Sequence, residues 1–262
     1  MNRRRPRNGW MALALVAALL GAAACGGGKS KKNEPTTPEE LSTQDKVRMA
    51  QSMLNAGRTG DAVDLLEQAL AEEPESAQLQ LFYGKINFQA GKFPEAEAAF
   101  RKAIELDPYL TDARNFLGAA CAEQGKTAEA EQQYLTALED PAYTSPEMVY
   151  LNLSLLYSSQ GRNLEAIDSL RKAVEINPRF YKAHFELASL LDREGNLDEA
   201  AREYEVAMPG FRSVGEFHYR LGFVYFRLGE KSKARDALER AIDVAPGSNS
   251  AAQAGELLKL MK

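Results

Sequence analysis

The sequence predicts an all-α protein, a right-handed solenoid of six helix-turn-helix repeats followed by a capping helix. One glycine series recurs at spacings of 34, 34, 36, 34 and 34 residues, and two alanine series keep the same register. A period of about 34 residues is typical of helix pairs that bury their apolar faces only by stacking on neighbouring pairs. The glycines are Gly57, Gly91, Gly125, Gly161, Gly195 and Gly229, and the alanines are Ala62, Ala96, Ala130, Ala166, Ala200 and Ala234, then Ala69, Ala103, Ala137, Ala173, Ala207 and Ala241.

The first segment, residues 1–24, has the features of a secretory signal. Four arginines precede an apolar run from Trp10 to Leu20, and small residues follow it up to Cys25. The run is shorter than the roughly 20 apolar residues of a membrane-spanning helix, so we expect it to be removed. A cysteine directly after small residues resembles the lipobox of bacterial lipoproteins, which implies that Cys25 is acylated, for example with palmitate. An ordinary secreted protein is the alternative.

Residues 25–42 predict a flexible tether behind this cysteine. They are rich in glycine, lysine, proline and threonine and have no apolar periodicity. Gly26, not an aspartate, follows the cysteine. By resemblance to bacterial lipoproteins, this implies an outer-membrane protein whose repeats face the periplasm.

Residues 43–247 contain the six repeats. We expect each glycine to end a first helix, where a left-handed residue is needed, and the alanines to let the second helix approach its partners closely. Larger apolar side chains then fill the seams between helices. The predicted repeats are 43–76, 77–110, 111–146, 147–180, 181–214 and 215–247, with the capping helix in 248–262.

Prolines support this phase and mark one irregular joint. Pro74, Pro108, Pro178 and Pro246 close four repeats, because proline stops a helix and turns the chain. The third repeat is two residues longer than the others, and its closing segment, 140–146, holds two prolines. We expect these prolines to stiffen the joint.

The pattern resembles the tetratricopeptide repeat family, which has a small residue at the eighth position of each repeat. Gly84, Gly118 and Gly222 stand at this position, although the tryptophan typical of the family is missing throughout. The resemblance implies that the first helices line a concave groove through their second, fifth, ninth and twelfth positions. It also implies a role in binding other proteins.

The predicted groove is mixed in character and apolar at both ends. An apolar groove suits an amphipathic helix or an extended segment of a partner protein. The alternative for these residues is partial burial between repeats. The predicted binding residues are Val47, Leu54, Leu81, Lys85, Phe88, Asn115, Tyr219, Phe223 and Phe226.

Composition and motifs argue against several other functions. The 262-residue chain has a formal net charge of −5, and loss of four arginines with the signal leaves −9, so we expect no nucleic-acid partner. The sequence holds no glycine-rich phosphate loop, metal-ligand cluster or nucleophile elbow, so we expect no enzymatic activity, cofactor or metal site. His184 and His218, 34 residues apart, are interpreted as structural, and Cys121 as a buried small hydrophobe.

A lipoprotein signal, six degenerate repeats and a lengthened joint after the third repeat together resemble the type IV pilus pilotins. This resemblance implies a lipid-anchored protein that binds secretin subunits and promotes their outer-membrane insertion and multimerisation. We expect it to act as a monomer. A general periplasmic scaffold for cell-wall synthesis or outer-membrane protein assembly is the alternative, and it differs only in the partner.

Overall fold

The computed structural model describes residues 41–261, and these residues form thirteen α-helices and no β-strand. Each predicted repeat contains two of the helices, the odd-numbered one first, and α13 follows the sixth repeat. The predicted all-α array is confirmed. The helices are α1 (Thr43–Asn55), α2 (Thr59–Glu72), α3 (Ala77–Gln89), α4 (Phe93–Leu106), α5 (Thr111–Glu123), α6 (Thr127–Leu138), α7 (Pro146–Ser159), α8 (Asn163–Ile176), α9 (Tyr181–Arg193), α10 (Leu197–Phe211), α11 (Gly215–Leu228), α12 (Lys231–Val244) and α13 (Asn249–Leu260).

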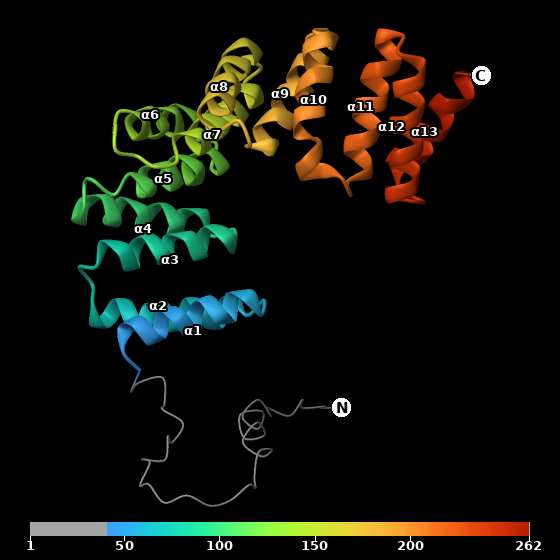
Figure 1. The fold of residues 1–262 in the computed structure, drawn as a ribbon. Helices are drawn as coiled ribbons and strands as arrows, with labels where there is room; N and C mark the ends of the chain where they lie inside the picture. Colours follow the sequence, from blue (N-terminus) through green and yellow to red (C-terminus); the bar gives the residue numbers. More distant parts are fainter. Residues whose placement is uncertain (1–40, 262) are drawn as a thin grey trace, which may run out of the picture. The chain divides into compact units, whose positions relative to one another are not determined.

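Helices that are consecutive in the chain pack side by side along the array (Figure 1). The two helices of a repeat share the most extensive contact, and each second helix also packs on the first helix of the next repeat. First helices touch one another as well, since α3 contacts α5 and α5 contacts α7. The first helices therefore gather on one side of the array, and α13 continues that side by packing on α11 and α12.

The two alanine series form the tightest part of the core. All twelve alanines are completely buried, so the prediction that helices converge at these positions is confirmed. The large side chains expected in the seams are also buried, among them Phe100 and Tyr134 on second helices and Leu117 and Leu187 on first helices. Burial of such side chains is the main force that stabilises the fold.

Turn residues fix where the helices begin and end. The six periodic glycines all have a positive φ, between 73° and 83°, as predicted. Gly229, for example, caps α11 in the left-handed conformation that other residues adopt only at a cost. Ser42 and Ser76 begin α1 and α3 by accepting a hydrogen bond from the backbone N–H three residues later.

One proline does not end its helix. Pro209 lies inside α10, which continues through Gly210 to Phe211. A Cβ on Gly210 would lie 2.8 Å from Cβ of Tyr181, so glycine allows the end of α10 to approach the start of α9. Phe211 then stacks on Phe185, with ring centroids 4.8 Å apart. The extension of α10 past Pro209 therefore brings Phe211 into an aromatic contact with Phe185.

The lengthened joint between α6 and α7 folds back onto the third repeat. The Tyr143 hydroxyl donates to the carboxylate of Asp112 over 3.1 Å, and the Thr111 hydroxyl donates to Asp140. The Asp140 carboxylate also accepts from the backbone N–H of Ala142, at 2.9 Å. Side-chain hydrogen bonds thus hold the two extra residues in a defined turn.

The small eighth residue of the second and third repeats is required by close packing. A Cβ on Gly84 would lie 2.5 Å from the Phe100 ring, and one on Gly118 would lie 2.6 Å from the Tyr134 ring. Cβ atoms essentially never approach another atom so closely. The aromatic ring of each second helix therefore rests directly on the backbone of its first helix.

We predict that Gly84→Ala lowers the free energy of unfolding by about 1–3 kcal/mol, because the new methyl group overpacks the contact with Phe100. Gly60→Ala is the matched control, since nothing lies within 4 Å of its would-be Cβ and it sits in a helix. That variant should be about 0.5–1 kcal/mol more stable than the parent. Urea unfolding followed by circular dichroism measures both, and equal stability of the two variants would contradict the packing argument.

Candidate functional site

The first helices present one continuous surface, here called the inner face. It is formed by the second, fifth, ninth and twelfth residues of each repeat, on α1, α3, α5, α7, α9 and α11. Because α11 also contacts α13, the last helix extends this surface. The predicted binding residues all belong to it, but the structure does not expose them equally.

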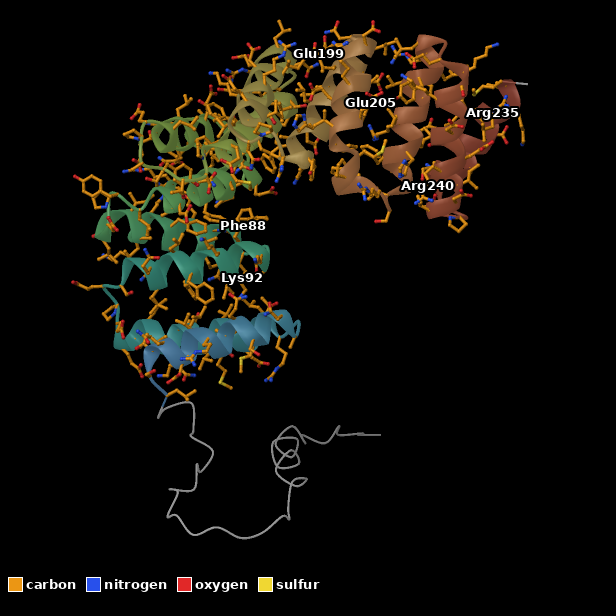
Figure 2. The ribbon with its side chains drawn as sticks, viewed as in Figure 1. Phe88, Lys92, Glu199, Glu205, Arg235 and Arg240 are labelled. Atoms are coloured by element: carbon orange, nitrogen blue, oxygen red, sulfur yellow. The ribbon has the colours of Figure 1, made fainter. Side chains whose placement is uncertain are left out.

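The amino-terminal end of the inner face holds a shallow depression between α1 and α3. It has a volume of about 340 Å³, and Val47, Gln44 and Phe82 contribute to its lining. Leu54 and Phe88 are half-buried. Phe88 lies near the end of α3 (Figure 2) and meets Phe93 edge to face at 5.4 Å. This end therefore offers apolar surface at Val47, Phe82 and Phe88.

Two predicted groove residues are core residues instead. Leu81 is 4% exposed and Asn115 is 6% exposed. Asn115 accepts a hydrogen bond of 2.9 Å from Asn152 of the next first helix. The reason is the direct contact between consecutive first helices, which covers the fifth position in the middle of the array. Neither residue offers a partner much surface.

The ammonium group of Lys85 also makes contacts within the protein. Its ammonium nitrogen lies 4.4 Å from the centroid of the Phe116 ring and 3.9 Å from the Asp112 carboxylate. These are a cation–π contact and a long ion pair with the next repeat. Lys85 therefore joins the second and third repeats along the inner face.

The carboxy-terminal end of the inner face is broader. Tyr219 and Phe223 stack with ring centroids 6.2 Å apart, and they line a depression of about 590 Å³ together with Leu257 and Leu260 of α13. Phe226, also predicted, is half-buried beside this site. This depression, shared between α11 and α13, is thus larger than the one at the amino-terminal end of the inner face.

The apolar centre of the inner face was not predicted from the sequence. Met148 and Leu155 of α7 are 40% and 44% exposed. They occupy the second and ninth positions of the fourth repeat, whereas the predicted binding residues come only from the first, second, third and sixth repeats. The contribution of Leu257 and Leu260 was missed because α13 lies outside the six-repeat register.

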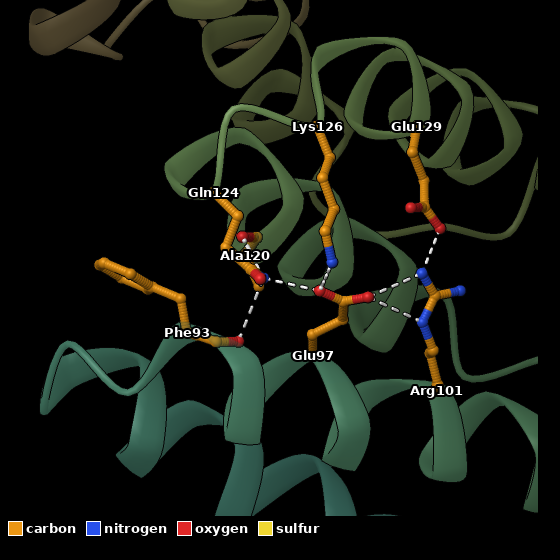
Figure 3. A network of polar contacts seen from close by, with 7 residues as sticks. All are labelled: Phe93, Glu97, Arg101, Ala120, Gln124, Lys126 and Glu129. Carbon is orange, nitrogen blue, oxygen red and sulfur yellow. Dashed lines mark hydrogen bonds and ion pairs between the residues drawn. The ribbon is translucent and has the colours of Figure 1, made fainter.

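A polar network lies between the second and third repeats (Figure 3). The carboxylate of Glu97 accepts hydrogen bonds from Lys126 at 2.5 Å, from Gln124 at 2.6 Å and from Arg101 at 2.9 Å. Arg101 also pairs with Glu129 of the next second helix. Burial alone raises the pKa of Glu97, but the hydrogen bonds from Lys126, Arg101 and Gln124 outweigh it and lower the pKa to about 2.

The same network brings together three groups that could in principle hold a metal ion. Ligand atoms of Glu97, Cys121 and Glu129 all lie within 4.8 Å of one another. Both carboxylates are already neutralised by the basic side chains around them. Burial raises the pKa of the Cys121 thiol to about 11, so it stays protonated and is a poor ligand. Cys121 is fully buried and acts as a small core residue, as predicted.

The two histidines are buried and tied to the turns that precede their helices. The ring Nε2 of His184 donates to the carbonyl oxygen of Pro178 over 3.2 Å, and that of His218 donates to the carbonyl oxygen of Arg212 over 2.9 Å. Nδ1 of His184 also meets the Glu203 carboxylate at 2.5 Å. Each histidine therefore anchors a loop, in keeping with the predicted structural role.

Cys25, the predicted lipidation site, lies outside the described residues together with the predicted signal in 1–24. Acylation of this cysteine stays a prediction. Within residues 41–261, the structure has no helix that is both long and apolar enough to cross a membrane.

We predict that Glu97→Gln destabilises the protein by roughly 2 kcal/mol at pH 7, because Lys126 and Arg101 lose a largely buried anionic partner. The pKa of Glu97 is lower in the folded protein than in the unfolded chain, so its contribution is full above the ordinary value of 4.5 and is lost as the pH falls toward 2. The difference between parent and variant in thermal unfolding should therefore disappear over that range. Glu105→Gln removes an exposed carboxylate paired with Lys102 and is the control. A difference independent of pH would contradict this account.

Comparisons with known proteins agree with the architecture. Profiles described as tetratricopeptide repeats match residues 47–110 and 151–211, residues 87–143, and residues 215–248. No curated protein sequence matches the chain.

Solved structures similar to this chain share its fold. PilF of Pseudomonas aeruginosa matches 80% of this chain and 95% of its own, with 21% sequence identity and a TM-score of 0.70. PilW, described as a widely conserved type IV pilus biogenesis factor, matches 79% of this chain and 96% of its own, with the same identity and TM-score. YrrB, described as having an unusual peptide-binding site, matches 73% and 97%, with 24% identity and a TM-score of 0.57. Because the matched profiles together span most of the described array, the chain belongs to the tetratricopeptide repeat family.

Proposed function

We propose that this protein is a pilotin, an outer-membrane lipoprotein that binds secretin subunits and promotes their membrane insertion and multimerisation for type IV pilus assembly. The observation that carries the proposal is the similarity of the whole helical array to PilF and PilW, which are themselves matched along almost their entire length. PilW is described as a type IV pilus biogenesis factor. A function that depends on the full array is best inferred from proteins whose helical arrays have a similar length.

The inner face supports binding over catalysis. Its exposed side chains are apolar at both ends and in the centre, where Met148 and Leu155 lie. An amphipathic helix or extended segment of a secretin subunit would cover such a surface with its apolar side chains. The depression at Tyr219 and Phe223 is the proposed main contact, because it has the larger volume.

The predicted acyl chains on Cys25 would hold the protein at the outer membrane, so secretin binding would take place there. Each buried methylene of an acyl chain stabilises membrane attachment by about 0.8 kcal/mol, and two chains make attachment stable. A tethered array meets secretin subunits at a high local concentration near the bilayer. Assembly at the outer membrane would follow from this proximity without any chemical step.

We predict that Leu155→Glu combined with Phe223→Glu weakens secretin capture roughly tenfold or more, because two charges then face the apolar segment of the partner. Leu164→Glu is the matched control, since Leu164 is 75% exposed on the second helix α8, away from the inner face. Capture is measured by pull-down from detergent-solubilised membranes, followed by blotting for secretin multimers. Equal capture by both variants would refute the inner-face assignment, and recovery of cell-wall enzymes with no secretin would favour the scaffold alternative.

We predict that Cys25→Ala leaves the repeats folded but moves the protein from the outer-membrane fraction to the soluble fraction, because the variant cannot carry the acyl chains. Membrane fractionation with immunodetection measures this, and circular dichroism checks the fold. Retention of the variant in the outer membrane would argue against lipidation at this residue.

A further inference from the structure

A pocket of about 470 Å³ opens on the side of the second helices, between α10 and α12, with the buried side of α11 as its floor. It is distinct from the inner face, which is formed by first helices and α13. Its volume is in the range typical of ligand sites, about 300–1,000 Å³. The lining residues are Met208, Arg212, His218, Leu221, Tyr225, Lys233, Asp236, Ala237 and Arg240.

In the preceding repeat a carboxylate fills this place. In the fifth repeat, Nε2 of His184 donates to a backbone carbonyl, and Nδ1 meets the carboxylate of Glu203. In the sixth repeat, His218 occupies the equivalent position and makes the same backbone contact. The residue 34 positions after Glu203 is Ala237, which has no carboxylate. Within residues 41–261, Nδ1 of His218 therefore has no hydrogen-bond partner.

The charges around the opening favour an anion. Arg212 and Arg240 are exposed, and among the described residues neither forms an ion pair. Figure 2 shows Arg240 on α12. Lys233 is already paired with Glu230 at 2.8 Å. Asp236 is the single acidic side chain in the lining, so two unpaired guanidinium groups outnumber it.

We propose that this pocket binds a carboxylate of a partner polypeptide together with an adjacent apolar side chain, and that the carboxylate takes the place that Glu203 fills one repeat earlier. The carboxylate would accept hydrogen bonds from the two arginines and would lie beside Nδ1 of His218, as Glu203 lies beside Nδ1 of His184. Met208, Leu221 and the ring of Tyr225 would contact the apolar part of the ligand. This site does not depend on the pilotin proposal, because it uses a different face of the array.

The chain's only two histidines make the test direct, because each gives its own imidazole signal in an NMR spectrum. N-Acetyl-leucyl-phenylalanine is titrated into the full-length chain and compared with its carboxy-terminal amide. The free acid should shift the His218 signals in a saturable way and leave those of His184 unchanged, since Glu203 already occupies that site. The amide should shift neither. N-Acetyl-glutamyl-phenylalanine amide, with its carboxylate on a side chain, shows whether a terminal or a side-chain carboxylate is preferred.

Two variants test whether the shifts of the His218 signals come from binding in this pocket. Ala237→Glu restores the carboxylate of the fifth repeat and should weaken binding of the free acid roughly tenfold or more. Arg240→Gln should also weaken it while leaving the core untouched, so the test holds even if Ala237→Glu fails to fold. Arg235→Gln on the same helix lies outside the pocket lining and should bind normally. Equal shifts for acid and amide, equal shifts of both histidines, or no saturable shift with either carboxylate peptide would overturn the proposal.

Discussion

The architecture depends on how closely the two helices of a repeat approach at the eighth position. Phe100 and Tyr134 rest on the backbones of Gly84 and Gly118, where no Cβ would fit, and Leu238 meets Gly222 in the same way. In these three repeats the contact brings the completely buried alanines of the second helix into place. The other three repeats have the small residues Ala50, Ser154 and Ala188 at this position. Once the pair is formed, its remaining apolar surface is buried only by the next pair. The positions of both candidate binding surfaces follow from this stacking.

Much of the fold could be predicted because equivalent positions in each repeat make equivalent contacts between helices. The periodic glycines have the positive φ that the spacing predicts, and the alanines are buried as expected. Contacts particular to one repeat could not be predicted in this way. Pro209 lies within α10 because Gly210 and Phe211 make favourable contacts with distant residues, and those contacts leave no local signal. The burial of Leu81 likewise depends on how closely neighbouring first helices approach, which a repeat register does not specify.

Two ion pairs in the same register join the third repeat to its neighbours on both sides. Glu97 pairs with Lys126, and 34 residues later Glu131 pairs with Arg162 at 2.8 Å in the same register. Hydrogen bonding from Arg162 lowers the pKa of Glu131, although burial opposes it. The equivalent positions of the other four repeats hold Val63, Ile167, Ala201 and Arg235. Because a charge-assisted hydrogen bond needs a defined geometry, these two pairs help to fix the third repeat, whose closing turn is lengthened, against its neighbours.

The pocket beside His218 follows from a single difference between the fifth and sixth repeats. A carboxylate at the position of Glu203 completes the contact with His184, whereas Ala237 leaves an opening beside His218. The backbone contact of the two histidines is unchanged, so the helix register survives the loss of the acidic side chain. Stability in a repeat array is close to a sum of neighbour contacts. The lack of a carboxylate at Ala237 therefore concerns the packing of α11 on α12, which is still the most extensive helix contact among the described residues.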